Sequence, residues 1–170
     1  MTCLNYADIK PNDSVNGIGI SVSLFVQGCD GKCEGCFNKE TWNFEHGKSF
    51  GGRELQYIKR CLHANDVKRN FSVLGGEPLH PRNIKEVVTI INNIKSFDNS
   101  IKIFVWTGYI FEELLRLYDK KMFNNIDVLI DGKFEKNKKD LTLKLRGSSN
   151  QRIIDIQKSL KENEVVLLNI

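Results

Sequence analysis

Three cysteines that fall within eight residues constrain this chain more than any other feature. Cys29, Cys33 and Cys36 follow directly on an apolar run that is typical of a buried strand. Their C-x3-C-x2-C spacing places three thiols in one loop, and three thiolates can hold three corners of a [4Fe–4S] cluster. Gly31 and Gly35 allow the tight turns and free amides that wrapping around a cluster requires. The loop offers no fourth ligand, so one iron would stay open to bind and act on a substrate.

Structural zinc is the alternative that this spacing leaves open. The three cysteines could bind zinc together with a fourth ligand such as His46 or Cys61. Zinc sites usually take their ligands as two pairs, however, and the chain has no second C-x2-C and no H-x3-H. Cys3 and Cys61 lie outside the loop, and we assign no role to them or to His46. The total of five cysteines is odd, which argues against a disulfide framework.

Length and charge limit what else the chain can be. Its 170 residues fit one domain, residues 1–170, and no apolar run approaches the ~20 residues that cross a bilayer. The segment that begins at Met1 lacks the basic and apolar regions of a signal peptide, so a cytoplasmic location is expected. The net charge is only +4, and the basic stretch Lys133–Lys139 is interpreted as a solvated loop. We therefore expect no membrane partner and no direct nucleic-acid partner.

Short β-rich runs alternate with helical periods along the chain. Strands are predicted at 20–26, 70–74, 101–106 and 126–130, with a short final strand at 165–168. Helices are predicted at 53–63, from Pro81 through Ile94, at 111–118 and at 149–160. This alternation predicts an α/β fold, a single-domain partial (open) β/α barrel with a mostly parallel sheet of five or six strands. Glycine turns at Gly28, Gly75-Gly76 and Gly108 follow three strands, on the edge where such folds place active sites.

The turn Gly75-Gly76-Glu77-Pro78 has a composition suited to holding a ligand. Its two glycines let the main chain approach a ligand closely, Glu77 offers an acceptor for an ammonium group, and Pro78 stiffens the exit. An ordinary turn between a strand and a helix would have the same composition. The turn gains meaning because it follows the strand after the cysteine loop.

Together, the cysteine loop and this turn resemble the radical S-adenosylmethionine superfamily. The resemblance rests on the cysteine spacing, on the aromatic Phe37 directly after the third cysteine, and on the GGE motif. It implies that the open iron is chelated by the amino and carboxylate groups of S-adenosyl-L-methionine, whose C–S bond breaks to give a 5′-deoxyadenosyl radical. It also implies that residues of both motifs bind this cofactor: Gly35, Cys36, Phe37, Gly75, Gly76 and Glu77.

Further motifs over nearly the whole chain are similar to those of anaerobic ribonucleoside-triphosphate reductase activating proteins. They are Val15-Asn16-Gly17, Leu24–Cys29, Cys36–Trp42, Gly75–Pro81, Val105–Tyr109, Val128–Phe134 and Arg146–Gln151. One departure is Ile18, which stands where that family commonly has proline, and it affects only a local turn.

This resemblance implies an activity and partners. The chain would take one electron from a low-potential donor such as flavodoxin and form a glycyl radical on the large subunit of the anaerobic (class III) reductase. No residue need act as an acid or base, because the cofactors supply the reactivity. A formate-lyase-type activase or a small-molecule-modifying enzyme would keep the same loop, and a zinc-stabilised binding module is the alternative that is not an enzyme. The role of the turn Arg146–Asn150 stays open.

Overall fold

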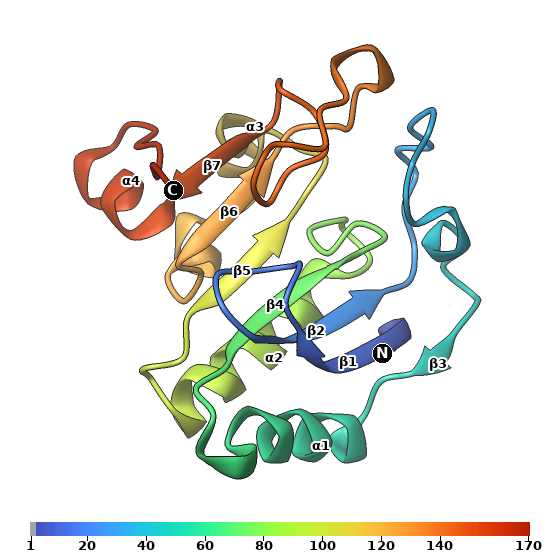
Figure 1. Cartoon of the computed structure of the whole chain (residues 1–170), viewed down its shortest axis with the longest axis vertical. Coiled ribbons are helices and arrows are strands. Elements are labelled where there is room, and N and C mark those ends of the chain that lie inside the picture. Colours follow the sequence, from blue (N-terminus) through green and yellow to red (C-terminus); the bar gives the residue numbers. More distant parts are fainter. Residues whose placement is uncertain (1–2) are drawn as a thin grey trace.

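The structure is a computed structural model that describes residues 3–170, so Met1 and Thr2, where the segment examined for a signal peptide begins, lie outside the described residues. The described strands form one open sheet in the order β3-β1-β2-β4-β5-β6-β7 (Figure 1). They are β1 (Asn5–Asp13), β2 (Ser21–Val26), β3 (Lys48–Ser49), β4 (Asn70–Gly75), β5 (Ile103–Trp106), β6 (Val128–Asp131) and β7 (Arg152–Asp155). The α-helices are α1 (Gly52–Leu62), α2 (Ile84–Phe97), α3 (Phe111–Leu117) and α4 (Ile156–Glu162). Short 3-10 turns lie at Lys39–Thr41, Ala64–Asp66, Lys120–Phe123 and Lys136–Lys138.

Most strands of the sheet run in one direction. β2, β4, β5 and β6 are parallel neighbours, whereas β1 pairs antiparallel with β2 and β7 pairs antiparallel with β6. β3 is antiparallel to β1 and so runs the same way as β2. The predicted α/β class and mostly parallel sheet are confirmed. The curvature of a partial barrel and the assignment of residues 1–170 to one domain stay predictions.

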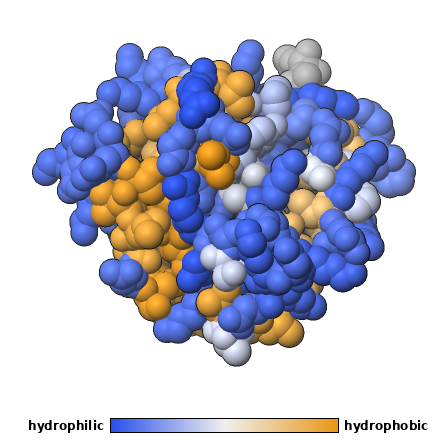
Figure 2. Space-filling view, turned by 90° about the horizontal axis from the view of Figure 1, so that it is seen from above, coloured by the Kyte–Doolittle hydropathy of each residue, from blue (hydrophilic) through white to orange (hydrophobic). Residues whose placement is uncertain are grey.

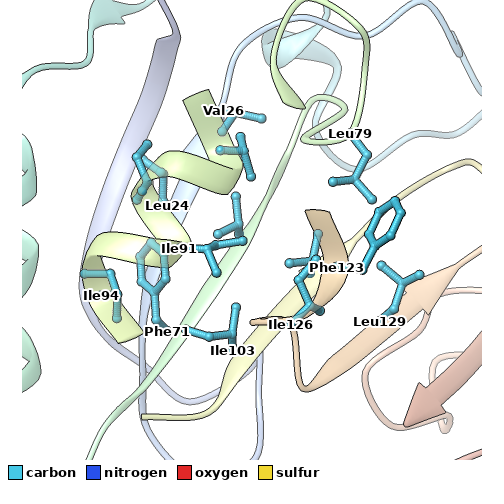
Figure 3. Close-up of a cluster of buried hydrophobic side chains, with 14 of the residues drawn as sticks. Leu24, Val26, Phe71, Leu79, Ile91, Ile94, Ile103, Phe123, Ile126 and Leu129 are labelled. Carbon is cyan, nitrogen blue, oxygen red and sulfur yellow. The ribbon is translucent and has the colours of Figure 1, made fainter. Parts of the chain in front are cut away.

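The main core lies between the sheet and its helices. Along α2, the side chains of Ile84, Val87, Ile91 and Ile94 recur every three or four residues, which places them on one helical face, and all four are buried. They pack with apolar residues of the strands, among them Phe71 near the start of β4 (Figure 3). This layer fixes the strands, so the loops that follow them start from a rigid base.

The other face of the sheet carries less apolar packing. All six residues of β2 are buried, as expected for a strand that is covered on both faces. Part of the cover comes from the segment after β1, where the carbonyl of Asn16 accepts a hydrogen bond from Ser72 Oγ at 2.6 Å. A second, smaller apolar cluster on the later strands comprises Phe104, Val128, Ile130 and Ile153. This face of the sheet is not filled by side chains everywhere, and the cavity described below lies on it.

Two strands near the N-terminus were not predicted from the sequence. β1 has a polar sequence with Pro11 inside it and lacks the alternation of a half-buried strand. Proline is tolerated there because β3 pairs only with Asn5 and Tyr6, which leaves the outer edge of β1 free at Pro11. β3 is only two residues long and lies outside any apolar run.

The helix predicted at 149–160 is partly wrong. Its first half is β7, which pairs with the free edge of β6, and α4 begins only at Ile156. The strand predicted at 165–168 reduces to one isolated bridge between Ile154 and Leu167. Pro81 is also misplaced, because α2 begins three residues later, at Ile84. Among the described residues, no helix has the length and apolar character needed to cross a membrane.

Candidate functional site

The cysteine loop leaves the sheet at the end of β2 and is closed at its base by backbone hydrogen bonds. Gly28 N donates to Thr41 O at 2.7 Å, and Cys29 N donates to Trp42 O at 3.0 Å. Gly28 has φ +98°, and a Cβ there would lie 1.9 Å from the ring of Phe44, so this position requires glycine. The loop therefore departs from the rigid sheet through a tightly packed turn.

All three cysteines of the loop line one cavity of about 630 Å³, and each is partly buried. Two of the sulfurs accept backbone hydrogen bonds: Cys29 Sγ from Gly31 N at 3.3 Å, and Cys36 Sγ from Asn38 N at 3.4 Å. Burial raises the pKa of Cys29 above that of an ordinary thiol, and the Gly31 amide opposes this rise. A positively charged group beside Cys29 would favour the thiolate form of this residue.

The described residues do not form a site for a single metal ion. Within residues 3–170, no three His, Cys, Asp or Glu side chains converge as such an ion requires. Neither His46 nor Cys61, the two candidates for a fourth zinc ligand, lines the cavity. Cys61 instead packs against the core from α1. All five cysteines are free.

The turn after β4 packs directly on the cysteine loop. Gly76 N donates to Val26 O at 2.8 Å, and Glu77 N donates to Gly28 O at 2.7 Å. A Cβ on Gly76 would lie 2.5 Å from the carbonyl oxygen of Gly28 and 2.9 Å from that of Thr41. The neighbouring backbone thus requires glycine at position 76, in addition to any approach to a ligand.

Glu77 is buried, and both of its carboxylate oxygens accept hydrogen bonds. The donors are Thr107 Oγ1 at 2.7 Å, Gly108 N at 2.6 Å and Leu79 N at 3.0 Å. Burial raises the pKa of Glu77, while these three donors and the charge of Lys133 lower it. A carboxylate has about four acceptor positions. Glu77 therefore keeps roughly one for a ligand and uses the others to join the turns after β4 and β5.

The remaining predicted site residues divide into two groups. Phe37 lines the cavity, and its ring packs edge-to-face on Phe134 at 5.3 Å between centroids. Gly75 also lines the cavity, together with Gly76 and Glu77. Gly35 is exposed and does not line it; the nearest side chains to a Cβ there would be those of Phe134 and Lys136. The structure thus brings five of the six predicted cofactor residues to the cavity and leaves Gly35 outside.

Several cavity residues were not identified from the sequence as site residues. They come from β1, from the turns after β5 and β6, and from the segment before β7: Lys10, Thr107, Tyr109, Lys133, Arg146 and Gln151. Position in the fold could have indicated these residues, because the turns after β5 and β6 follow parallel strands and so meet the other turns at one edge of the sheet. Lys133 was set aside as part of a basic loop, yet it reaches this cavity.

Gln151 gives the motif Arg146–Gln151 a structural role. Its side-chain oxygen accepts from Gly147 N at 2.9 Å and Ser148 N at 3.2 Å, and its amide nitrogen donates to Gly132 O at 2.9 Å. Two turns that are far apart in the sequence are therefore held together at the cavity wall. The Nε of Arg146, beside them, is buried and has no hydrogen-bond partner among the described residues.

Comparison with known proteins shows the family to which this chain belongs. The family model described as "4Fe-4S single cluster domain" matches residues 15–154. An anaerobic ribonucleoside-triphosphate reductase-activating protein of Pasteurella multocida is 40% identical over 152 residues, which cover 88% of this chain and 96% of the relative. Proteins with the same name from Enterobacteria phage T4 and Escherichia coli K12 are 41% and 40% identical, over 88% and 87% of this chain and 93% and 96% of their own lengths. With matches of this extent, the chain belongs to the family of anaerobic ribonucleoside-triphosphate reductase-activating proteins and contains a 4Fe-4S single cluster domain.

Proposed function

We propose that this chain is a radical S-adenosylmethionine enzyme that activates an anaerobic ribonucleoside-triphosphate reductase by forming a glycyl radical on its large subunit. One observation carries the proposal: three loop thiols and the turn Gly75-Gly76-Glu77 line the same cavity at the carboxyl ends of parallel strands. The names of the relatives and the matched cluster domain support the same activity.

The residues of the cavity suit the two cofactors. Cys29, Cys33 and Cys36 would hold a [4Fe–4S] cluster, since thiolates are the ligands that such clusters favour and amide donors near the sulfurs tune them. S-adenosyl-L-methionine would bind beside it along Gly75, Gly76, Glu77, Cys36 and Phe37. We keep Gly35 only as a residue that shapes the loop, because it does not line the cavity.

A [4Fe–4S] cluster held by the three thiols would supply one electron for the reductive cleavage of S-adenosyl-L-methionine bound beside it, and this chemistry would remove the Cα hydrogen of the reductase glycine. The chain's own residues bind, orient and exclude water. Glu77 keeps acceptor capacity for the ammonium of the methionine moiety, and the rings of Phe37 and Phe134 wall the cavity. A low-potential donor such as flavodoxin, in the cytoplasm, would supply the electron.

Metal analysis tests the ligand set. Anaerobic reconstitution should give about four irons and four sulfides per chain, as one cubane requires. Alanine at Cys29, Cys33 or Cys36 should abolish the cluster, whereas Cys61→Ala is the matched control and should retain it, since Cys61 packs in the core away from the cavity. Zinc without iron or sulfide would support the zinc-stabilised module instead.

Hydrogen transfer tests the activity itself. Mixed anaerobically with the reductase, S-adenosyl-L-methionine and a reductant, the protein should produce a doublet-type organic radical signal in electron paramagnetic resonance. Deuterium placed on the Cα of the radical glycine should appear in 5′-deoxyadenosine, because the adenosyl carbon takes that hydrogen directly. Cleavage of the cofactor without deuterium transfer and without a glycyl radical would point to a small-molecule substrate and contradict the proposal.

A further inference from the structure

The segment between Lys133 and Arg146 has a tip that the proposed function does not explain. It leaves the sheet after β6 and returns before β7, and Asp140 N donates to Gly147 O at 3.1 Å across its base. Trp106 Nε1 donates to Leu145 O at 2.7 Å and ties the tip to β5. The tip, residues 141–145, is therefore held beside the cavity.

This tip presents apolar side chains to the cavity. Leu141, Leu143 and Leu145 alternate with polar residues, and all three line the cavity. Leu141 is 75% exposed, and Val15, which lines the same cavity from the segment after β1, is 74% exposed. We call these four residues the apolar rim. Figure 2 shows that hydrophobic patches do reach the surface on the face seen from above. Apolar side chains gathered at an exposed place mark an interaction site.

Positive charge accumulates on the same segment. Residues 132–146 contain six basic and two acidic side chains, an excess as large as the +4 of the whole chain. Lys136 and Lys138 are each paired with a glutamate at 2.7 Å. Lys144, between two rim leucines, is exposed and makes no ion pair within residues 3–170. An uncompensated lysine next to an apolar rim is complementary to a partner that carries acidic side chains beside apolar ones.

We propose that the apolar rim and Lys144 dock the glycine-bearing segment of the reductase. The segment would lie extended, with an apolar side chain against Leu141 and an acidic one near Lys144. This inference rests on the proposed function, which needs a backbone glycine of another protein to reach the cavity of the three thiols. Glycine has no side chain, so an extended segment held at the rim can pass its glycine between the loops without steric hindrance.

Binding measurements on the full-length, anaerobically reconstituted protein test this docking surface. Leu141→Asp and Lys144→Glu should each raise the Kd for the reductase large subunit at least tenfold. The matched controls Leu117→Asp on α3 and Lys161→Glu on α4 change exposed residues that do not line the cavity, and they should keep the parent Kd within twofold. Added salt should weaken the parent complex more than the Lys144→Glu complex, because a charge pair is screened only in the parent.

Dithionite replaces the protein electron donor in this assay, so a defect in radical formation does not come from lost binding of that donor. Two further readouts then locate any defect. Lys144→Glu should cleave S-adenosyl-L-methionine at the parent rate when the reductase is absent and yield less glycyl radical when the reductase is limiting. Rim variants that bind the reductase as the parent does overturn the docking proposal, and so do variants that lose only flavodoxin-driven cleavage. If the parent binds the reductase through the rim but transfers no hydrogen, the docking surface stands and the proposed activity fails.

Discussion

Gly76 lies where the turn after β4 crosses the turn after β2, and its contacts there are backbone atoms. Flexible side chains can yield to an added methyl group, but the carbonyls of Gly28 and Thr41 belong to the base of the cysteine loop. A single hydrogen atom at this position therefore lets the two turns that line the cavity pack together. The residue acts on the geometry of the thiols as well as on any ligand.

We expect Gly76→Ala to distort the loop that carries the cysteines. Its Cβ would stand 2.5 Å from Gly28 O, so the variant should lose about 1–3 kcal/mol of unfolding free energy, as overpacked sites do. It should also take up less iron on reconstitution. Urea denaturation and iron analysis measure the two effects. Gly52→Ala is the matched control, because a Cβ there meets nothing within 4 Å and the first turn of α1 favours alanine. Full iron uptake by Gly76→Ala would contradict the expectation.

At the scale of elements, a charged cluster joins β6, β7 and α3. The carboxylate of Asp131 is fully buried at the end of β6 and accepts hydrogen bonds from Arg152 Nε at 3.0 Å and from Phe111 N at 2.9 Å. Arg152, on β7, also donates to Glu112 of α3 at 2.7 Å. The turn that carries Lys133 begins at Asp131, so this cluster sets one wall of the cavity.

Removing the Arg152 side chain should therefore destabilise the folded protein. Arg152→Ala leaves the Asp131 charge buried without its partner, and we expect a loss of about 3–5 kcal/mol in urea denaturation. Lys158→Ala breaks only a pair at 3.9 Å between an exposed lysine and Asp155, and it should cost less than about 1 kcal/mol. A loss no larger than that of the control would show that Asp131 finds another donor.

The same cluster predicts a dependence on pH. Hydrogen bonding to Arg152 holds the pKa of Glu112 below its usual value. The resulting stabilisation is complete above the pKa of an unfolded-state glutamate and is lost as the pH falls through the lowered folded-state pKa. As the pH falls through the acid range, the unfolding free energies of the parent and of Glu112→Gln should thus converge. A constant difference at every pH would exclude this linkage.

At the scale of the whole molecule, the cysteine loop lies outside the hydrophobic core. The main core packs the sheet against its helices, and Cys29, Cys33 and Cys36 are not part of it. Its largest fully buried side chains include Phe71, Phe111 and Phe123. We therefore expect the fold to depend on apolar burial rather than on a metal.

The variant with alanine at Cys29, Cys33 and Cys36 should fold without any cluster. Its far-ultraviolet circular dichroism should match the parent, and its unfolding free energy should lie within about 1 kcal/mol of the cluster-free parent, because none of the three side chains is in the core. Phe71→Ala, which opens a cavity in the main core, should lose about 3–5 kcal/mol of unfolding free energy. Loss of the spectrum in the triple variant would indicate folding coupled to metal, as in zinc-stabilised modules.

Local patterns in the sequence determined the fold class and the two motifs that meet at the cavity. Apolar runs and helical periods alternate, and parallel strands must end at one edge, so a loop after β2 and a turn after β4 come together whatever their details. Phe37, Gly75, Gly76 and Glu77 reach the cavity for this reason.

Only the tertiary structure decided the contacts between distant segments. Ile153 and Ile154 fit a helix or a strand equally well, and the free edge of β6 selected the strand. The carbonyl of Gly28 leaves no room for a side chain at position 76. Glu77 accepts a hydrogen bond from Thr107, thirty residues away along the chain. Periodicity reports which face of an element is buried, but not which turn lies against it. These partners are therefore set by packing across the sheet, which no local pattern encodes.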